Sequence, residues 1–198
     1  MSNKENLSNK QGGTANIGSE HTGIKKLWYD RSPVLRFILL FILFMGIFYI
    51  LLWGQDFFQE GVVVAVTRFD AKLASIGLNL FGYGTTTEGA ALTSPQMTVN
   101  VKTGCDGIEA MAMFVSGVLA YTASWGHKIR GLLYGLAFLF AVNVLRVMHL
   151  WLTGLYMPQY FEFFHQNLWQ IIFILVAILT WAFWISRIRP AQKANVSI

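Results

Sequence analysis

Eight residues mark the point where a short alternating segment meets a long apolar one: Lys102-Thr103-Gly104-Cys105-Asp106-Gly107-Ile108-Glu109. This stretch contains the only cysteine of the chain. A single cysteine cannot form a disulfide within one chain, so Cys105 is either a small buried side chain or a reactive thiol. The organisation of the surrounding sequence bears on this choice.

The composition predicts an integral membrane protein. Of the 198 residues, 55% are hydrophobic and 13% are charged, whereas about 25% of the residues in a soluble domain are charged. The net charge of +5 comes from basic residues that flank apolar blocks, which is typical of topology signals. No basic patch with interleaved aromatic residues is present. We therefore expect a lipid bilayer, and no nucleic acid, as the partner of this chain.

Four apolar blocks predict an all-α fold with about four transmembrane helices. They cover residues 34–53, 107–124, 131–156 and 168–185. About 20 apolar residues are enough to cross a hydrocarbon core of roughly 30 Å. The polar residues 1–30 predict a disordered cytoplasmic tail and residues 191–198 a second one, so that residues 31–190 form the membrane domain.

Residues 57–82 are apolar in part but too charged to cross the bilayer. The interrupting residues are Arg68, Asp70 and Lys72. Charges at the bilayer centre cost several kcal/mol each. Leu73, Ile76 and Leu80 recur at helical spacing, which predicts an amphipathic helix that lies in the outer interface or dips into it as a re-entrant segment.

A short β-like segment is expected just before Cys105. Met97, Val99 and Val101 alternate with polar residues, and a period of two residues is typical of a strand with one buried face. We predict a strand, half of a hairpin, that forms a small platform on the outer face of the membrane.

The distribution of lysine and arginine predicts the orientation of the chain. Eleven of the fifteen lie on one side of the predicted spans: Lys4, Lys10, Lys25, Lys26, Arg31, Arg36, Lys128, Arg130, Arg187, Arg189 and Lys193. Basic residues accumulate in cytoplasmic segments, so both termini are predicted to be cytoplasmic. Cys105 and the loop of residues 157–167 then face outward. The aromatic residues of this loop predict an interfacial rim: Tyr160, Phe161, Phe163 and Phe164.

Arg146 is the strongest anomaly in the predicted spans. It lies within the third span, roughly 14 Å from its outer end. An arginine in a span usually faces the bundle interior or a wet cavity and has a partner. Asn143 precedes it by three residues, on the same helical face, where it can orient the guanidinium. A structural arginine bonded to backbone carbonyls is the alternative interpretation.

Cys105, Arg146 and a histidine together suit acyl transfer. Cys105 lies in the first turn of an outward-facing helix, where the helix N-terminus stabilises a thiolate. His165 lies just ahead of the fourth span, where the helix N-terminus keeps the imidazole neutral and able to accept a proton. His149, three residues after Arg146, is the rival for this role. The thiolate would attack a carbonyl, the histidine transfer protons and the arginine stabilise the oxyanion.

A metal site is the alternative use of these side chains. Cys105, Glu109, His149 and His165 carry suitable ligand atoms. No two of the cysteine and histidine ligands have the short spacing that is typical of a zinc site. We expect no metal and no cofactor.

The order and spacing of these residues resemble the exosortase/archaeosortase family. The matching stretches are Gly104-Cys105-Asp106-Gly107-Ile108-Glu109-Ala110, Asn143-Val144-Leu145-Arg146-Val147, and His165 ahead of the last span, over roughly residues 95–187. The run from Cys105 to Met111 and the tripeptide Leu168-Trp169-Gln170 are most similar to the exosortase H branch.

The resemblance implies a membrane cysteine peptidase or transpeptidase with several spans. Such enzymes recognise exported proteins by a C-terminal sorting signal, made of a short motif, a transmembrane helix and a basic cluster. They cleave near the motif at the outer face of the membrane, with water or another acceptor completing the reaction. The resemblance makes Cys105 the nucleophile, Arg146 the oxyanion or substrate-orienting group, His165 the general base or acid, and Asn143 a supporting residue. The enzyme would act in the inner membrane, with its active site on the periplasmic side.

The chain departs from the family pattern in two ways. Asp106 stands where many members have serine or asparagine, and a carboxylate beside the thiol opposes thiolate formation unless it faces away. The chain also has fewer spans than the larger members, so accessory recognition regions are expected to be absent. A non-catalytic membrane scaffold or assembly factor for the export of surface proteins or polysaccharides is the main alternative function. A transporter around Arg146 ranks last, because the sequence lacks an inverted repeat.

Overall fold

The computed structural model describes residues 33–54, 58–101 and 106–194. Contacts divide the chain into two units, residues 1–36 and 37–198. The first unit contributes only the start of helix α2, Pro33–Gly54, to the described residues. The second unit is mainly helical, and it confirms the predicted all-α class of membrane protein.

Three helical stretches are long and apolar enough to cross a membrane: Pro33–Leu52, Trp125–Tyr156 and Pro158–Ile188. The second predicted span, residues 107–124, is realised as helix α4, Ile108–Ala120. At 1.5 Å per residue, 13 residues reach only about 20 Å. The described residues therefore contain three candidate spans and one shorter apolar helix, where the sequence predicted about four spans.

Helix α5, Trp125–Tyr156, begins before the third predicted span. The basic residues that we expected in a turn form its first turns, because the backbone carbonyl of Ser124 accepts bonds from the N–H groups of His127 and Lys128. The change of direction occurs instead between the end of α4 and Ser124.

The loop predicted at residues 157–167 is largely helical, which corrects the predicted start of the fourth span. A 3₁₀ turn η2, Pro158–Tyr160, leads to a π-helical segment η3, Phe163–Leu168, and this runs directly into α6, Trp169–Ala194. Proline fits the first position of a helical turn because its missing N–H is not needed there. Helix α6 also extends past the predicted end of its span, to Ala194.

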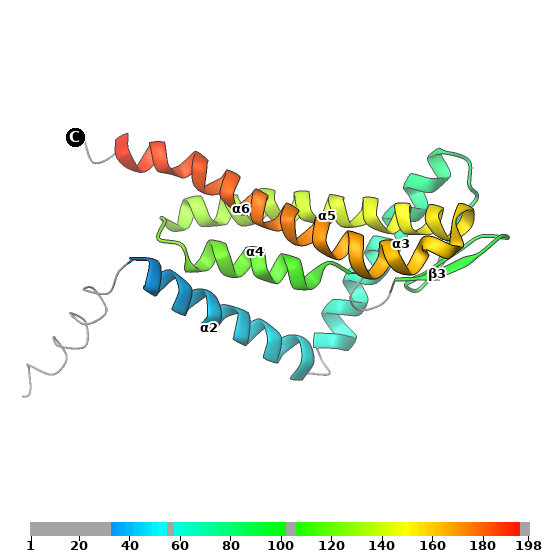
Figure 1. Ribbon diagram of the computed structural model, residues 1–198, viewed down its shortest axis with the longest axis horizontal. Coiled ribbons are helices and arrows are strands. Elements are labelled where there is room, and N and C mark those ends of the chain that lie inside the picture. Colours follow the sequence, from blue (N-terminus) through cyan, green and yellow to red (C-terminus); the bar gives the residue numbers. More distant parts are fainter. Residues whose placement is uncertain (1–32, 55–57, 102–105, 195–198) are drawn as a thin grey trace, which may run out of the picture. The chain divides into compact units, whose positions relative to one another are not determined.

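Helices α4, α5 and α6 run side by side (Figure 1) and share an apolar core. Phe114 and Val118 of α4, Leu139 of α5, and Phe173 and Ala177 of α6 are buried in it. Many apolar side chains on α5 and α6 are nevertheless exposed, as expected where lipid rather than water surrounds the protein.

A π-helical turn η1, Phe58–Val63, precedes helix α3, Val64–Leu80, which packs against α5. The face of α3 that we predicted to be apolar points outward: Ile76 is 51% exposed and Leu80 is 82% exposed. The buried face is made of smaller and polar residues, including Ala71, Ala74 and Ser75. Small residues let two helices approach closely in a membrane, and this packing displaces the larger side chains to the outside.

The predicted strand is present and belongs to a sheet of three strands rather than to a single hairpin. Strands β1, Thr86–Glu88, β2, Ala91–Thr93, and β3, Thr98–Asn100, are antiparallel in the order β1-β2-β3. The sheet lies where α5 ends and α6 begins (Figure 1). Leu92 and Val101 pack there against Leu150 and Trp151 of α5.

Hydrogen bonds fasten the start of the sheet to α3. The Asn79 side chain donates to the Thr85 carbonyl at 2.8 Å and accepts from its N–H at 2.6 Å. Ser75 Oγ bonds the same carbonyl at 3.0 Å. The sheet therefore has a fixed place beside α5, and β3 leads the chain toward residues 102–105.

Candidate active site

Helix α5 carries two of the predicted site residues on one buried face. Asn143 is fully buried and Arg146 is 2% exposed. Their spacing of three residues places them on one side of the helix, as predicted. Arg146 Nη2 donates to the backbone carbonyl of His165 at 3.5 Å, and the guanidinium also acts electrostatically on the His165 ring. The fold therefore brings Arg146 and His165 together from two different helical segments.

Cys105, the predicted nucleophile, lies outside the described residues, as do residues 102–104. Asp106, which follows it directly, is 2% exposed. Asp106 Oδ1 accepts a hydrogen bond from the N–H of Ile108 at 3.0 Å. This carboxylate oxygen is thus turned toward the first turn of α4, where the unpaired N–H groups of a helix stabilise negative charge.

Gly107 fixes the junction between Asp106 and α4. Its φ of +68° lies in the left-handed region, which favours glycine. A Cβ on this residue would lie 2.5 Å from the ring of Phe173 and 2.9 Å from Asn143 Oδ1. No other residue fits both the backbone conformation and the space, so this turn is held directly against Asn143.

Asp70 of α3 also belongs to the polar cluster around Asn143, although the sequence analysis did not predict it as a site residue. It is fully buried, and its Oδ2 accepts a hydrogen bond of 2.9 Å from Asn143 Nδ2. Burial raises the pKa of Asp70 to about 7, the bond from Asn143 opposes this rise, and the charge of Asp106 adds to it. The two neighbouring charges, Arg68 and Lys72, are exposed. In the sequence, the only sign that Asp70 is buried is its position on the same helical face as Ala74 and Leu78.

The two candidate histidines have different surroundings. His149 Nδ1 accepts a hydrogen bond of 3.0 Å from Trp169 Nε1, and its ring packs against the rings of Phe164 and Trp169. His165 is half-buried, stacks on Phe161 with 5.7 Å between ring centroids, and lies next to Arg146. One nitrogen of His149 is therefore committed to holding α6 against α5.

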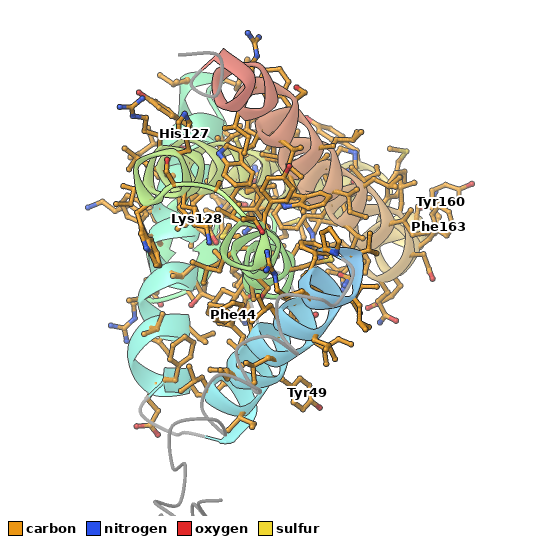
Figure 2. The ribbon with its side chains drawn as sticks, turned by 90° about the vertical axis from the view of Figure 1, so that its left-hand side faces the viewer. Phe44, Tyr49, His127, Lys128, Tyr160 and Phe163 are labelled. Carbon is orange, nitrogen blue, oxygen red and sulfur yellow. The ribbon has the colours of Figure 1, made fainter. Side chains whose placement is uncertain are left out.

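The four residues of the predicted aromatic rim divide into two pairs. Phe161 and Phe164 pack against His165 and His149. Tyr160 and Phe163 are more than half exposed and point away from the bundle (Figure 2). Only the second pair is free to meet the interface of a membrane. His127, which Figure 2 labels beside Lys128, lies at the start of α5, far along the helix from Arg146.

A cleft of about 540 Å³ opens beside His165. One wall is formed by β3 and the residues that flank it, Met97 to Val101. The opposite side contains Leu150 of α5, Phe161 and Glu162. The cleft thus lies between the small sheet and His165, and it has room for several side chains of a ligand.

A buried arginine next to a histidine, inside a bundle of membrane-length helices, defines a multi-pass membrane protein with a polar site between its helices. A family model described as transmembrane exosortase (Exosortase_EpsH) matches residues 27–184. The match covers most of the chain, so the protein belongs to the transmembrane exosortase family, as the sequence motifs predicted. No curated protein and no solved structure matches the chain.

Proposed function

We propose that the protein is a membrane cysteine peptidase or transpeptidase that cleaves the C-terminal sorting signal of exported proteins. Cleavage occurs at the periplasmic face of the inner membrane, and both termini are cytoplasmic. The observation that supports this most is the buried Arg146, which donates to the backbone carbonyl of His165 and lies beside the junction that follows Cys105. A permanent charge buried between helices is costly unless it has a partner or a task.

The proposed reaction proceeds through a thioester. The Cys105 thiol passes its proton to His165, and the sulfur attacks the carbonyl carbon of the scissile peptide bond to form a C–S bond. Arg146 N–H groups stabilise the oxyanion that develops. His165 then returns the proton to the leaving amine as the C–N bond breaks. Water or an acceptor amine attacks the thioester, gives its proton to His165, and releases the thiol.

The neighbours of these three groups support the assignment. Asp106 directs one oxygen to the N–H of Ile108, so part of its charge is balanced by the start of α4. Asn143 lies against Gly107 through Oδ1 and holds Asp70 through Nδ2. Asn143 thus supports both the junction and the helix face that carries Arg146.

Replacing the nucleophile tests the proposal. Cys105→Ala should abolish processing of an exported reporter that carries a motif, one apolar span and a basic end, while the variant inserts into the membrane at the normal level. Processing at the wild-type rate would contradict the enzyme assignment and favour the scaffold. The reporter is taken from the same genome, and its mobility on a gel measures cleavage.

Separate histidine variants test the choice of proton carrier. His165→Ala should lower the initial rate by about 10²-fold to 10⁴-fold, as the loss of a general acid or base does. His149→Ala should mainly lower thermal stability, because it removes the bond to Trp169. His127→Ala, at the other end of α5, is the matched control. A rate lost in His149→Ala and kept in His165→Ala would reverse the assignment.

A further inference from the structure

The outer edge of β3 is open among the described residues. In the sheet order β1-β2-β3, β3 pairs with β2 on one side only. The N–H of Val101 bonds the carbonyl of Ala90 at 3.0 Å, and the N–H of Ser94 bonds the carbonyl of Met97 at 2.9 Å. Opposite residues in an antiparallel pair alternate between bonded and non-bonded positions. Met97, Val99 and Val101 therefore direct their backbone groups toward β2.

Thr98 and Asn100 consequently direct their N–H and C=O groups to the open edge. Both side chains are exposed, whereas Val99 between them packs toward the core. The unpaired edge of a sheet is a template for another extended chain. The backbones of Thr98 and Asn100 thus offer two N–H donors and two C=O acceptors, spaced as in a β-strand.

This edge borders the cleft beside His165. Thr98 and Asn100 line the cleft from one side, and His165 lines it with Phe161 from the other. An extended peptide that pairs with β3 would lie in the cleft, with alternate side chains directed to its apolar wall of Val147 and Leu150. Its backbone would pass close to the residue that we assign to proton transfer.

The chemistry of the edge selects a peptide over a lipid. An acyl chain has no donors or acceptors, so it would leave the backbone groups of Thr98 and Asn100 unpaired, at a cost in free energy for each group that is shielded from water. A polypeptide strand satisfies all four of them. Glu162, exposed at the rim of the cleft, also disfavours a negatively charged lipid headgroup.

We propose that the short motif of the sorting signal binds as an added strand along the open edge of β3, within the cleft that His165 lines. This inference rests on the proposed function and specifies how its substrate is recognised. Main-chain pairing would provide binding that tolerates sequence variation, and the pockets for alternate side chains would provide selectivity.

Proline at the edge tests the pairing. Asn100→Pro removes the outward N–H without touching the ladder to β2, and edge positions tolerate proline. We expect kcat/KM for the reporter to fall about ten-fold or more, because a hydrogen bond is lost and the ring blocks the approaching strand. An unchanged kcat/KM would overturn the inference.

Thr87→Pro is the matched control. The register Thr87↔Leu92 places Thr87 at a non-bonded position of β1, so its backbone groups face the opposite edge of the sheet, away from β3. The same substitution there should leave kcat/KM within about two-fold of wild type, since no strand is expected at that edge. If both variants lost kcat/KM equally, activity would depend on the integrity of the whole sheet rather than on the edge that borders the cleft. That result would overturn the inference.

Disulfide trapping measures the geometry itself. In a Cys105→Ala background, Asn100→Cys is combined with single cysteines at successive positions of the reporter motif. A paired strand predicts cross-links at every second position, because side chains alternate between faces. Equal cross-linking at consecutive positions, or none, would overturn the inference.

Failure of this inference differs from failure of the proposed function. If the wild-type protein processes no reporter, or if Cys105→Ala processes it normally, the enzyme assignment falls and the substrate-binding inference falls with it. If processing depends on Cys105 while Asn100→Pro is unaffected, only the added strand is excluded. Thermal stability of both proline variants in detergent separates loss of binding from loss of folding.

Discussion

The two halves of helix α5 differ in that only the second buries strongly polar side chains. In the first half, Gly131 and Gly135 leave space for aromatic rings, and a Cβ at either position would overlap Trp184 or Phe114. In the second half, Asn143 and Arg146 are buried among polar partners from α3 and η3. Close apolar packing holds the first half, while the second half contains groups whose burial is costly.

The difference indicates where stability and chemistry reside. Contacts between glycine and aromatic side chains contribute dispersion energy without desolvating any charge. Removing one partner from a buried polar set leaves the other uncompensated, which costs about 1–3 kcal/mol for a neutral group and more for a charge. We therefore expect variants of the first half to change stability at constant rate, and variants of Asn143 and Arg146 in the second half to change the rate as well as the stability.

Within α5, the largest effect is expected at Arg146. Arg146→Ala should lower the processing rate by about 10²-fold to 10³-fold, as the loss of an oxyanion donor does. Arg146→Lys should recover part of this rate, because it keeps the charge but not the planar fork of donors. The initial rate per folded molecule is the measurement. If Arg146→Ala folded poorly but kept the wild-type rate per folded molecule, the two halves of α5 would not differ in their effect on the rate.

A smaller effect, on stability alone, is expected at Gly135. Gly135→Ala forces the ring of Phe114 to shift, and overpacking of this kind costs about 1–3 kcal/mol. The melting temperature in detergent should fall, and the rate per folded molecule should stay constant. Gly126→Ala is the control, since a Cβ there meets nothing within 4 Å. A reduced rate in Gly135→Ala would show that the halves are coupled.

The smallest effect concerns the pH dependence of Asp70. Its folded pKa of about 7 lies above the ordinary value of 3.8, so the folded protein holds this proton more tightly than the unfolded chain. The resulting stability is fully present below about pH 4 and is lost as the pH rises through about 7. Asp70→Asn cannot titrate, so its melting temperature should depend less on pH.

The comparison is made between about pH 5 and about pH 8, over which the contribution of Asp70 to stability should be lost, so that the melting temperature of the wild-type protein falls relative to that of Asp70→Asn. Glu88→Gln, on the exposed face of β1, is the matched control and should keep the wild-type slope. An unchanged slope in Asp70→Asn would contradict the buried, protonated carboxyl.

The polar half of α5 was predictable from the sequence in part. An asparagine and an arginine three residues apart within an apolar block have one favourable place, the inside of a helical bundle, and the structure buries both. Asp70 was not predictable in the same way, because it stands between Arg68 and Lys72, and all three interrupt the apolar pattern equally. Its place on the helical face of Ala74 and Leu78 becomes informative only once tertiary packing shows that this face is buried.

Hydrophobic periodicity predicted that α3 is a helix, but not which of its faces packs against α5. Leu73, Ile76 and Leu80 marked an apolar face for the membrane interface, and Ile76 and Leu80 are indeed exposed. Close packing between helices in lipid favours small residues, so the face with Ala71, Ala74 and Ser75 is the one that turns inward. The helical ends of α4, α5 and α6 depend on caps and π-helical turns, which the apolar pattern does not encode.

The shortness of α4 has a consequence for the bilayer itself. A helix of about 20 Å cannot reach both faces of a hydrocarbon core of roughly 30 Å. Either the lipid thins around α4, or polar residues at its ends draw water below the normal surface. In both cases the two aqueous phases approach each other most closely along α4. Where α4 crosses the bilayer, the membrane potential would fall over a shorter distance than along the 32 residues of α5, and a charge at its N-terminal end, such as that of Asp106, would experience the steeper field.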